Sequence, residues 1–206
     1  LNGKVTLMAG HSGVGKSTLS THIAGYLASQ GARVTLCDAD AQQSALGWLG
    51  IRPTEARPIQ GWNARSEDGL RLPADAAHMV LDTPAGLHGR WLKDVIKRAD
   101  KVLVPVQPSI FDMAATRAFF EDLQERKRAQ DLDIAVVGMR VDQRTLAAEN
   151  LHSFLAGLGL PVLGCLRGTQ NYVRLAMEGL TVFDVAPSRV ERDLEDWQPI
   201  CAWLDR

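Results

Sequence analysis

Short runs of aliphatic and β-branched residues alternate along the chain with longer segments in which apolar residues recur every three or four positions. The runs that predict strands are Lys4–Ala9, Arg33–Cys37, Met79–Leu81, Val102–Val106, Ile134–Val137 and Pro161–Leu163. Several of these runs are apolar throughout, as expected for strands that are covered on both faces. The alternation predicts an α/β fold with a single doubly wound, mostly parallel sheet and helices on both of its faces.

Three of the intervening segments carry clear helical spacing. Their apolar positions are Leu19, Ile23 and Leu27, then Trp91, Leu92, Val95, Ile96 and Ala99, then Ala115, Ala118, Phe119 and Leu123. Residues 51–77 break the pattern because they are rich in Pro, Gly, Arg and Asp, and we expect one strand there, Pro58–Trp62, and a variable loop. No repeat, low-complexity tract or long linker divides the chain, so we expect one domain over residues 1–206.

Composition narrows the class of protein. Apolar residues make up 46% of the chain and charged residues 23%, the balance of a soluble globular protein. The net charge of −1 excludes a wholly basic nucleic-acid coat, although not a local basic patch. No apolar run approaches the roughly 20 residues that span a bilayer, and the first residues do not resemble a signal peptide. The three cysteines lie far apart, which excludes a zinc or disulfide framework and leads us to expect a cytoplasmic protein.

Residues 10–17 read GHSGVGKS and match the phosphate-loop pattern GxxxxGK[ST]. A buried strand precedes the match and a helix follows it, which is the context that phosphate binding requires. The glycines let backbone N–H groups surround a phosphate, and the helix N-terminus adds positive potential. Lys16 can reach the outer phosphates and Ser17 can hold Mg²⁺. A dinucleotide site is disfavoured because the GxGxxG spacing fails. The segment therefore predicts a nucleoside-triphosphate site.

Acidic residues follow two of the predicted strands. Asp82 ends an apolar strand, as in a Walker B segment, where it can contact Mg²⁺ directly or through water; the alternative is a strand-end aspartate that caps the next turn. Asp38 and Asp40 follow the second strand, at the edge where open α/β sheets bind ligands. They are either solvated loop charges or groups that hold a metal-bound water and orient the attacking water.

Taken together, these segments resemble the ParA/MinD family of deviant Walker ATPases. The matching segments are Gly13–Thr18, Asp38–Gln42, Asp82–Ala85, Pro105–Ser109 with Asp112, and Arg167–Phe183. They occur in the family's order and span nearly the whole chain. The resemblance implies a P-loop fold that binds ATP with Mg²⁺ between two subunits, hydrolyses it slowly to ADP and phosphate, and forms a homodimer under nucleotide control.

The resemblance also assigns roles to individual residues. It implies nucleotide binding by Ser12, Gly13, Val14, Gly15, Lys16, Ser17, Thr18 and Arg140, and metal binding by Ser17, Asp38 and Asp82. It makes Asp40, which positions the hydrolytic water, and Lys16 the catalytic residues. Arg140 falls near the family's adenine contact, although the asparagine common there is replaced by Met139.

One position departs from the family pattern. The family carries a lysine early in the phosphate loop that reaches the partner's ATP, and this chain has His11 there. A mostly neutral imidazole is shorter and supplies no permanent charge. Three alternatives follow: another cation substitutes in trans, hydrolysis is slow and binding alone switches the dimer, or the protein is a P-loop phosphotransferase with residues 51–77 as a substrate lid. The cations considered for the first alternative are Arg90, Lys93, Arg117 and Arg144.

Basic residues recur at helical spacing after the Walker B segment. They are Arg90, Lys93, Lys97 and Lys101. This face is either a solvated helix surface or a stripe that contacts phosphates of non-specific DNA, which family members use to associate with the nucleoid. The sequence carries no base-reading module.

The C-terminal segment disfavours a membrane role. Residues 178–206 carry seven acidic residues against three arginines, and such a helix is repelled by anionic lipid. The apolar stripe there is expected to pack on the domain; its members are Trp197, Ile200, Cys201 and Leu204. The sequence thus predicts a ParA-like ATPase that positions a cargo and responds to an activating protein on that cargo.

Overall fold

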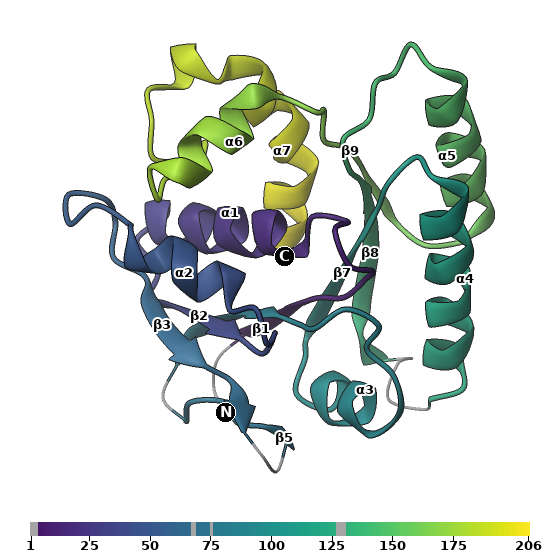
Figure 1. The fold of residues 1–206 in the computed structure, drawn as a ribbon, viewed down its shortest axis with the longest axis horizontal. Coiled ribbons are helices and arrows are strands. Elements are labelled where there is room, and N and C mark those ends of the chain that lie inside the picture. Colours follow the sequence, from purple (N-terminus) through teal and green to yellow (C-terminus); the bar gives the residue numbers. More distant parts are fainter. Residues whose placement is uncertain (1–3, 67–68, 75, 127–130) are drawn as a thin grey trace.

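A parallel sheet forms the centre of the computed structural model, which describes residues 4–66, 69–74, 76–126 and 131–206 (Figure 1). Within these residues the sheet has seven strands in the order β3-β2-β6-β1-β7-β8-β9, and all neighbours are parallel. The strands are β1 Lys4–Met8, β2 Val34–Asp38, β3 Gln60–Asn63, β6 His78–Asp82, β7 Lys101–Val106, β8 Asp133–Gly138 and β9 Val162–Cys165. The predicted α/β fold and all seven predicted strands are confirmed, with end points shifted by one or two residues.

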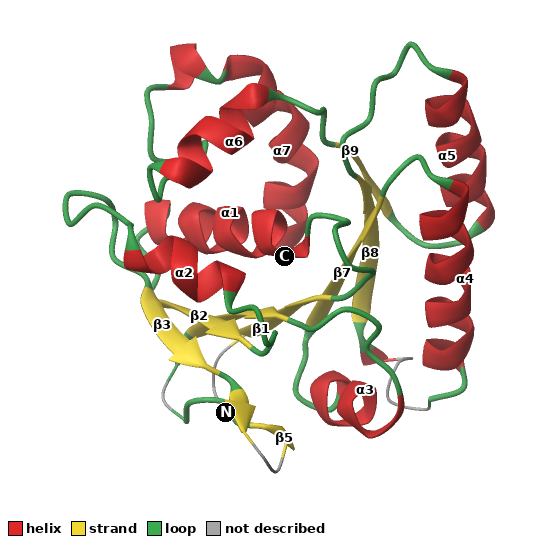
Figure 2. Ribbon diagram, viewed as in Figure 1, coloured by secondary structure: helices red, strands yellow, loops and turns green. Residues whose placement is uncertain are grey.

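Helices cover both faces of this sheet (Figure 2). They are α1 Lys16–Ser29, α2 Ser44–Gly50, α3 Gly89–Ile96, α4 Ile110–Gln124, α5 Leu146–Gly157, α6 Gln170–Met177 and α7 Glu191–Leu204, with a short 3₁₀ turn at Pro187–Arg189. Side chains of α1, α2, α6 and α7 share one buried cluster, and side chains of α3, α4 and α5 share the other. Because both faces are buried, the central strands have to be apolar throughout, which is the pattern the sequence shows.

The last helix packs on the domain as predicted. Trp197 and Ile200 are fully buried, and Leu204 is 5% exposed. Along the described part of the chain, no helix has both the length and the apolar character needed to cross a bilayer.

Lys101 corrects one prediction. The spacing of basic residues placed it on the face of a helix, but α3 ends at Ile96 and Lys101 is the first residue of β7. Its ammonium group donates to the Trp203 carbonyl at 2.8 Å and to an Asp133 carboxylate oxygen at 2.9 Å, and its side chain is 8% exposed. Lys101 therefore anchors the C-terminal helix and is not available to DNA.

The segment 51–77 contains more structure than one strand and a loop. After β3 it forms an antiparallel hairpin of β4 Arg65–Ser66 and β5 Gly69–Leu70. At its start, Arg52 makes a buried ion pair of 2.7 Å with Asp184, the two side chains being 4% and 5% exposed. The beginning of the segment is thus fixed to the C-terminal part of the domain. The expected lid also includes residues 67, 68 and 75, which lie outside the described residues.

Candidate nucleotide-binding site

The phosphate loop connects β1 to α1 at the carboxyl edge of the sheet. Gly13 and Gly15 have φ angles of 75° and 105°, which non-glycine residues rarely adopt. A Cβ on Gly15 would also lie 2.7 Å from the Met139 Cε. Among the described residues no side chain caps α1, and its first turn holds no acidic residue. The first N–H groups of the helix therefore remain free to bind an anion.

Lys16 lies over this loop. Its Nζ donates to the His11 carbonyl at 2.6 Å, and the residue is 7% exposed. Burial lowers the pKa of Lys16, while the nearby carboxylates of Asp82 and Asp40 act in the opposite direction. The lysine charge is thus held close to both carboxylates, on the side where phosphates bind in such a loop.

Ser17 and Asp82 form the centre of the candidate metal site. The Ser17 hydroxyl donates to Asp82 Oδ2 at 2.6 Å. The second oxygen, Asp82 Oδ1, is buried and has no hydrogen-bond partner among the described residues. Burial raises the pKa of Asp82 to about 6, against the stabilising hydrogen bond from Ser17. A buried acceptor without a partner is unusual in a native protein and points to a group that binds there.

This donor set fits Mg²⁺. In the part of the chain that the structure describes, His, Cys, Asp and Glu side chains nowhere form a group of three or more that could hold a metal ion. Mg²⁺ commonly takes only one or two protein oxygens and completes its shell with substrate phosphates and water. The Ser17 hydroxyl and the free Asp82 oxygen supply ligands of the required kind.

Asp38 shapes the loop that follows β2. Its Oδ1 accepts the N–H of Asp40 at 3.0 Å, and its Oδ2 accepts the N–H groups of Ala45 and Leu46 at 3.0 and 3.2 Å. Burial raises the pKa of Asp38, and these N–H groups oppose the rise. Asp38 is paired in register with Asp82 on β6, so the two aspartates lie side by side. Asp38 thus caps α2 and fixes the loop that carries Asp40, and the metal-binding role expected of it stays a prediction.

Asp40 faces an open cleft of about 480 Å³. The cleft is lined by the loop residues Ala39, Asp40 and Ala41, by Arg65 of the hairpin, by residues 84–88 that follow β6, and by Trp91 of α3. Asp40 is only partly buried, and its Oδ1 accepts the Gln42 N–H at 2.8 Å. Arg65 was not among the predicted site residues. Arg65 lies two residues beyond the end of β3, just as Asp40 lies two residues beyond the end of β2, and this shared position is the feature that could have indicated it.

A second cavity, of about 470 Å³, opens beside the start of α1. It brings the predicted residues Gly15, Thr18 and Arg140 together with Gly168 and Tyr172. The sequence gave no individual role to Gly168 or Tyr172, which lie in the matching segment Arg167–Phe183.

The wall of this cavity is supported by α7. The Arg167 guanidinium binds Asp193 and Asp196, both at 2.8 Å. The indole N–H of Trp197 donates to the Tyr172 hydroxyl at 3.0 Å.

His11 and the cations considered as its substitutes lie in different surroundings. His11 lines a pocket of about 340 Å³ against α4, formed with Leu87 and Phe119 among others, which shares residues 86–88 with the cleft beside Asp40. Arg144 pairs with Asp142 at 2.9 Å, and the Arg117 guanidinium lies 5.5 Å from the centre of the Phe154 ring.

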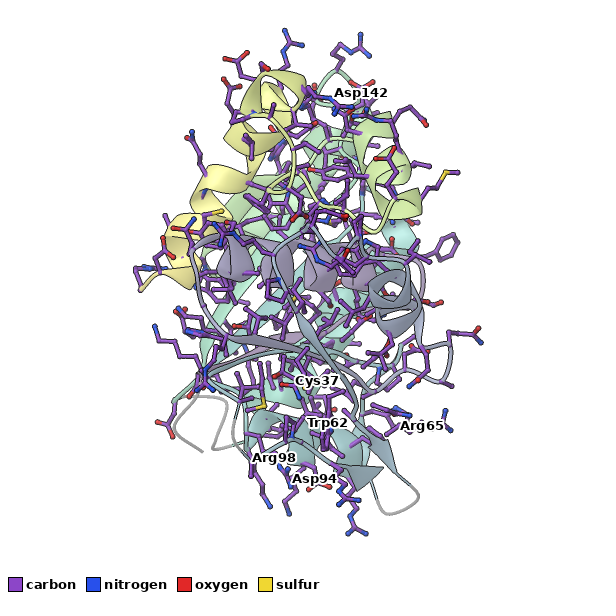
Figure 3. The ribbon with its side chains drawn as sticks, turned by 90° about the vertical axis from the view of Figure 1, so that its left-hand side faces the viewer. Cys37, Trp62, Arg65, Asp94, Arg98 and Asp142 are labelled. Carbon is purple, nitrogen blue, oxygen red and sulfur yellow. The ribbon has the colours of Figure 1, made fainter. Side chains whose placement is uncertain are left out.

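Three of the four predicted DNA-contacting residues are exposed together on α3 and its C-terminal cap. Arg90, Lys93 and Lys97 face outward, whereas Leu92, Val95 and Ile96 are buried. Arg90 lies 3.9 Å from Asp94. Arg98, which the helical spacing did not include, is also exposed at this end of the molecule (Figure 3).

The fold and the site define a P-loop nucleotide-binding domain, because the glycine-rich loop at the β1–α1 junction lies beside aspartates at the ends of neighbouring parallel strands. The chain belongs to the CobQ/CobB/MinD/ParA family, whose nucleotide-binding domain matches residues 5–182. This finding confirms the ParA/MinD resemblance predicted from the motifs.

Individual relatives match along most of the chain. It is 30% identical to the maintenance of carboxysome distribution protein A of Gloeobacter kilaueensis, over 98% of this chain and 94% of that protein. It is 26% identical to the chromosome-partitioning ATPase Soj of Thermus thermophilus, over 74% and 75% of the two chains. The fold is also that of a putative plasmid partition protein from Borrelia burgdorferi B31 bound to AMPPNP, with a TM-score of 0.74, 16% identity and coverage of 97% and 99%.

Proposed function

We propose that residues 1–206 form a single ATPase domain that partitions or positions a cargo, such as a plasmid, a chromosome or a protein assembly. The observation that carries the nucleotide chemistry is the contact between Ser17 and Asp82 beside the N-terminus of α1, where the buried Asp82 Oδ1 has no partner in the described part of the chain. The similarity to a carboxysome distribution protein and to a chromosome-partitioning ATPase supports the cellular role.

The site residues have separate roles in ATP hydrolysis. The N–H groups of residues 12–18 and the Lys16 ammonium bind the phosphates, and Ser17 and Asp82 hold Mg²⁺, which neutralises phosphate charge when bound. Asp40 orients a water whose oxygen bonds to the γ-phosphorus. The bond from that phosphorus to the β–γ bridging oxygen breaks and its electron pair leaves with ADP. The water proton passes to Asp40 and then to the released phosphate.

The cavity of Thr18, Arg140 and Tyr172 holds the base in this proposal. Its volume of about 470 Å³ lies in the range of small-molecule sites. Met139 is 4% exposed; its Cε lies against Gly15, and the residue also lines this cavity, so it shapes both the phosphate loop and the base cavity.

ATP binding closes a homodimer, and this dimer binds DNA without sequence specificity through Arg90, Lys93 and Lys97. Their charges would contact phosphates and release counterions, and a dimer would double the number of contacts. A protein on the cargo stimulates hydrolysis and releases the dimer. In this proposal the protein is cytoplasmic and associates with the nucleoid.

The solution mass of Asp40→Ala tests the switch. We expect twice the 22.5 kDa monomer mass by light scattering with Mg-ATP and the monomer mass with Mg-ADP. This variant is chosen because we expect it to bind ATP without hydrolysing it, so hydrolysis cannot dissociate the dimer during the measurement. A monomer with both nucleotides would contradict the proposal.

The cleft beside Asp40 supports one alternative, a phosphotransferase with a small acceptor, because its volume of about 480 Å³ suits a metabolite. A monomer in both nucleotide states, with ATP consumption only when an acceptor is added, would support this alternative. The buried Arg52–Asp184 pair argues against a lid that moves as a whole over residues 51–77.

A further inference from the structure

The phosphate loop supplies fewer positive charges than the ParA/MinD pattern. Within residues 10–18, Lys16 is the only permanent cation, because position 11 holds a histidine. His11 lines the pocket against α4, which adjoins the cleft that Asp40 faces through the shared residues 86–88. Phosphoryl transfer builds negative charge that a second cation normally stabilises. For this site to hydrolyse ATP by that route, another residue has to supply the second charge.

Arg65 is fixed at the edge of the sheet where the phosphates bind. Asp38 on β2 is paired in register with Asn63 on β3. The next residue, Ala64, donates its N–H to the Asp38 carbonyl at 2.8 Å, and the Arg65 N–H is bound by Asn63 Oδ1 at 3.0 Å. Asp40 and Arg65 thus each lie two residues beyond a paired position on neighbouring parallel strands. This register brings them to the same edge of the sheet.

Both side chains line one cleft. The cleft of about 480 Å³ includes Asp40, Arg65 and the loop 84–88 that follows the Walker B aspartate. Figure 3 shows Arg65 on the hairpin beside Trp62, toward the end of the molecule that carries α3. A cation in this cleft faces the same space as the aspartate that orients the attacking water in our proposal.

Arg65 is exposed, and its guanidinium has no hydrogen-bond or ion-pair partner within the described ranges. None of the carboxylates in the described ranges pairs with it. Of the cations considered earlier, Arg144 pairs with Asp142 and Arg117 packs on Phe154, while Arg90 and Lys93 are exposed on α3.

The backbone around Arg65 is well supported. Ala64 is fully buried, and its carbonyl accepts the Arg71 N–H at 2.9 Å across the hairpin. The Trp62 indole donates to the Arg71 carbonyl at 2.8 Å. These contacts fix the backbone that carries Arg65, so only its side chain has to be ordered when the guanidinium meets the phosphate.

We propose that Arg65 acts in cis as the second cation at the γ-phosphate, in place of the lysine that the family carries at the position of His11. Its planar guanidinium, with five donors, suits two oxygens of the phosphoryl group. While the water oxygen bonds to the γ-phosphorus and the bond to the bridging oxygen breaks, Arg65 stabilises the charge on the phosphoryl oxygens and on departing ADP. This inference rests on the proposed ATPase function.

The first test measures binding of ADP, Mg²⁺ and aluminium fluoride, which mimics the transferring phosphoryl group, with ATP affinity measured in parallel. The matched control is Arg71→Ala, which removes an exposed arginine of the same hairpin that does not line the cleft. We expect Arg65→Ala to lose the aluminium fluoride complex and about 10³-fold in turnover, as for other arginine fingers, while keeping ATP affinity. Arg71→Ala should match wild type in every measurement.

A mixing experiment decides between cis and trans action. Equal amounts of Arg65→Ala and Asp40→Ala are combined with Mg-ATP, because Asp40→Ala is expected to keep ATP binding and the ATP-dependent dimer. If Arg65 acts in cis, no subunit in the mixture has both Arg65 and Asp40, and turnover stays at the sum of the two variants. Recovered turnover would overturn the cis assignment, because an Asp40→Ala subunit would then be supplying Arg65 across the dimer.

The outcomes separate this inference from the proposed function. Wild-type protein that does not bind ATP would refute the proposed function itself. Wild-type protein that binds ATP but not aluminium fluoride, or an Arg65→Ala variant with wild-type turnover and complex formation, would overturn only the role of Arg65. Loss in an Arg144→Ala variant alone would assign the charge to that residue instead.

Discussion

Replacing Asp82 by asparagine should stabilise the nucleotide-free protein while removing its use of Mg²⁺. Asp82 is 1% exposed, and burial raises the pKa of its carboxyl from 3.8 to about 6. A folded-state pKa above the unfolded one means that the folded protein binds the proton more tightly. The ionised carboxylate therefore destabilises the folded state, and that loss develops as pH rises from about 4 to 6.

The size of the effect follows from this shift. About two pH units at ~1.4 kcal/mol each give about 3 kcal/mol of stability lost between pH 4 and pH 6.5. Asparagine is uncharged and can still accept the Ser17 hydrogen bond, so Asp82→Asn does not suffer this loss. We expect the two proteins to be similarly stable at pH 4 and the variant to be about 3 kcal/mol more stable at pH 7.5.

Urea unfolding of both proteins at half-unit steps from pH 4 to pH 7.5, without nucleotide or Mg²⁺, measures this difference. Groups that do not interact with Asp82 titrate equally in both proteins and cancel in the difference, which therefore reports Asp82 together with its coupling to Lys16 and Asp38. A stability difference that does not change with pH would refute the reasoning. With Mg-ATP added, the order should reverse, because wild type gains binding free energy that the variant lacks.

Three further predictions concern the loop and the basic stripe. Lys16→Ala should abolish ATP binding measured by titration calorimetry, and normal affinity would contradict the phosphate site. Gly15→Ala should lower the free energy of unfolding by about 1–3 kcal/mol, because its φ is 105° and the new methyl would lie 2.7 Å from Met139; unchanged urea unfolding would contradict this. Lys93→Glu combined with Lys97→Glu should weaken DNA binding about tenfold or more in low salt and leave the ATP-dependent dimer intact, as checked by anisotropy and light scattering. Unchanged DNA affinity would contradict the DNA-binding role and favour the alternative, a solvated helix surface.

The sequence predicted the strands well because their physical requirement is local. A strand buried on both faces has to be apolar at every position, and that demand is visible in a run such as Val102–Val106. The phosphate loop was equally visible, since its glycines have to adopt left-handed backbone angles at fixed spacing.

Lys101 shows where such reasoning fails. In the sequence, basic residues continue at helical spacing beyond Ile96, but α3 ends at Ile96 and the chain turns there. The carboxylate of Asp100 accepts the Val5 N–H at 2.8 Å, and the Asp100 N–H donates to the Val5 carbonyl at 2.9 Å. These contacts join residues that lie 95 positions apart in the sequence, so the periodicity of a short segment cannot predict them.

Arg65 was missed for a related reason. It lies in a segment without periodicity, and its relation to Asp40 exists only through the register of β2 and β3. Strand order and register depend on the whole sheet, so a single sequence cannot place such a residue.

In the proposed binding mode, the contacts of Arg167 and Tyr172 with α7 connect the C-terminal helix to the occupancy of the base cavity. Asp193, Asp196 and Trp197 of α7 hold the wall of the proposed base cavity, although α7 does not line that cavity. Any ligand that tightens the wall then also makes detachment of α7 less frequent. Amide hydrogen exchange in α7 should therefore slow when the cavity is filled, which makes the end of the chain a remote reporter of occupancy.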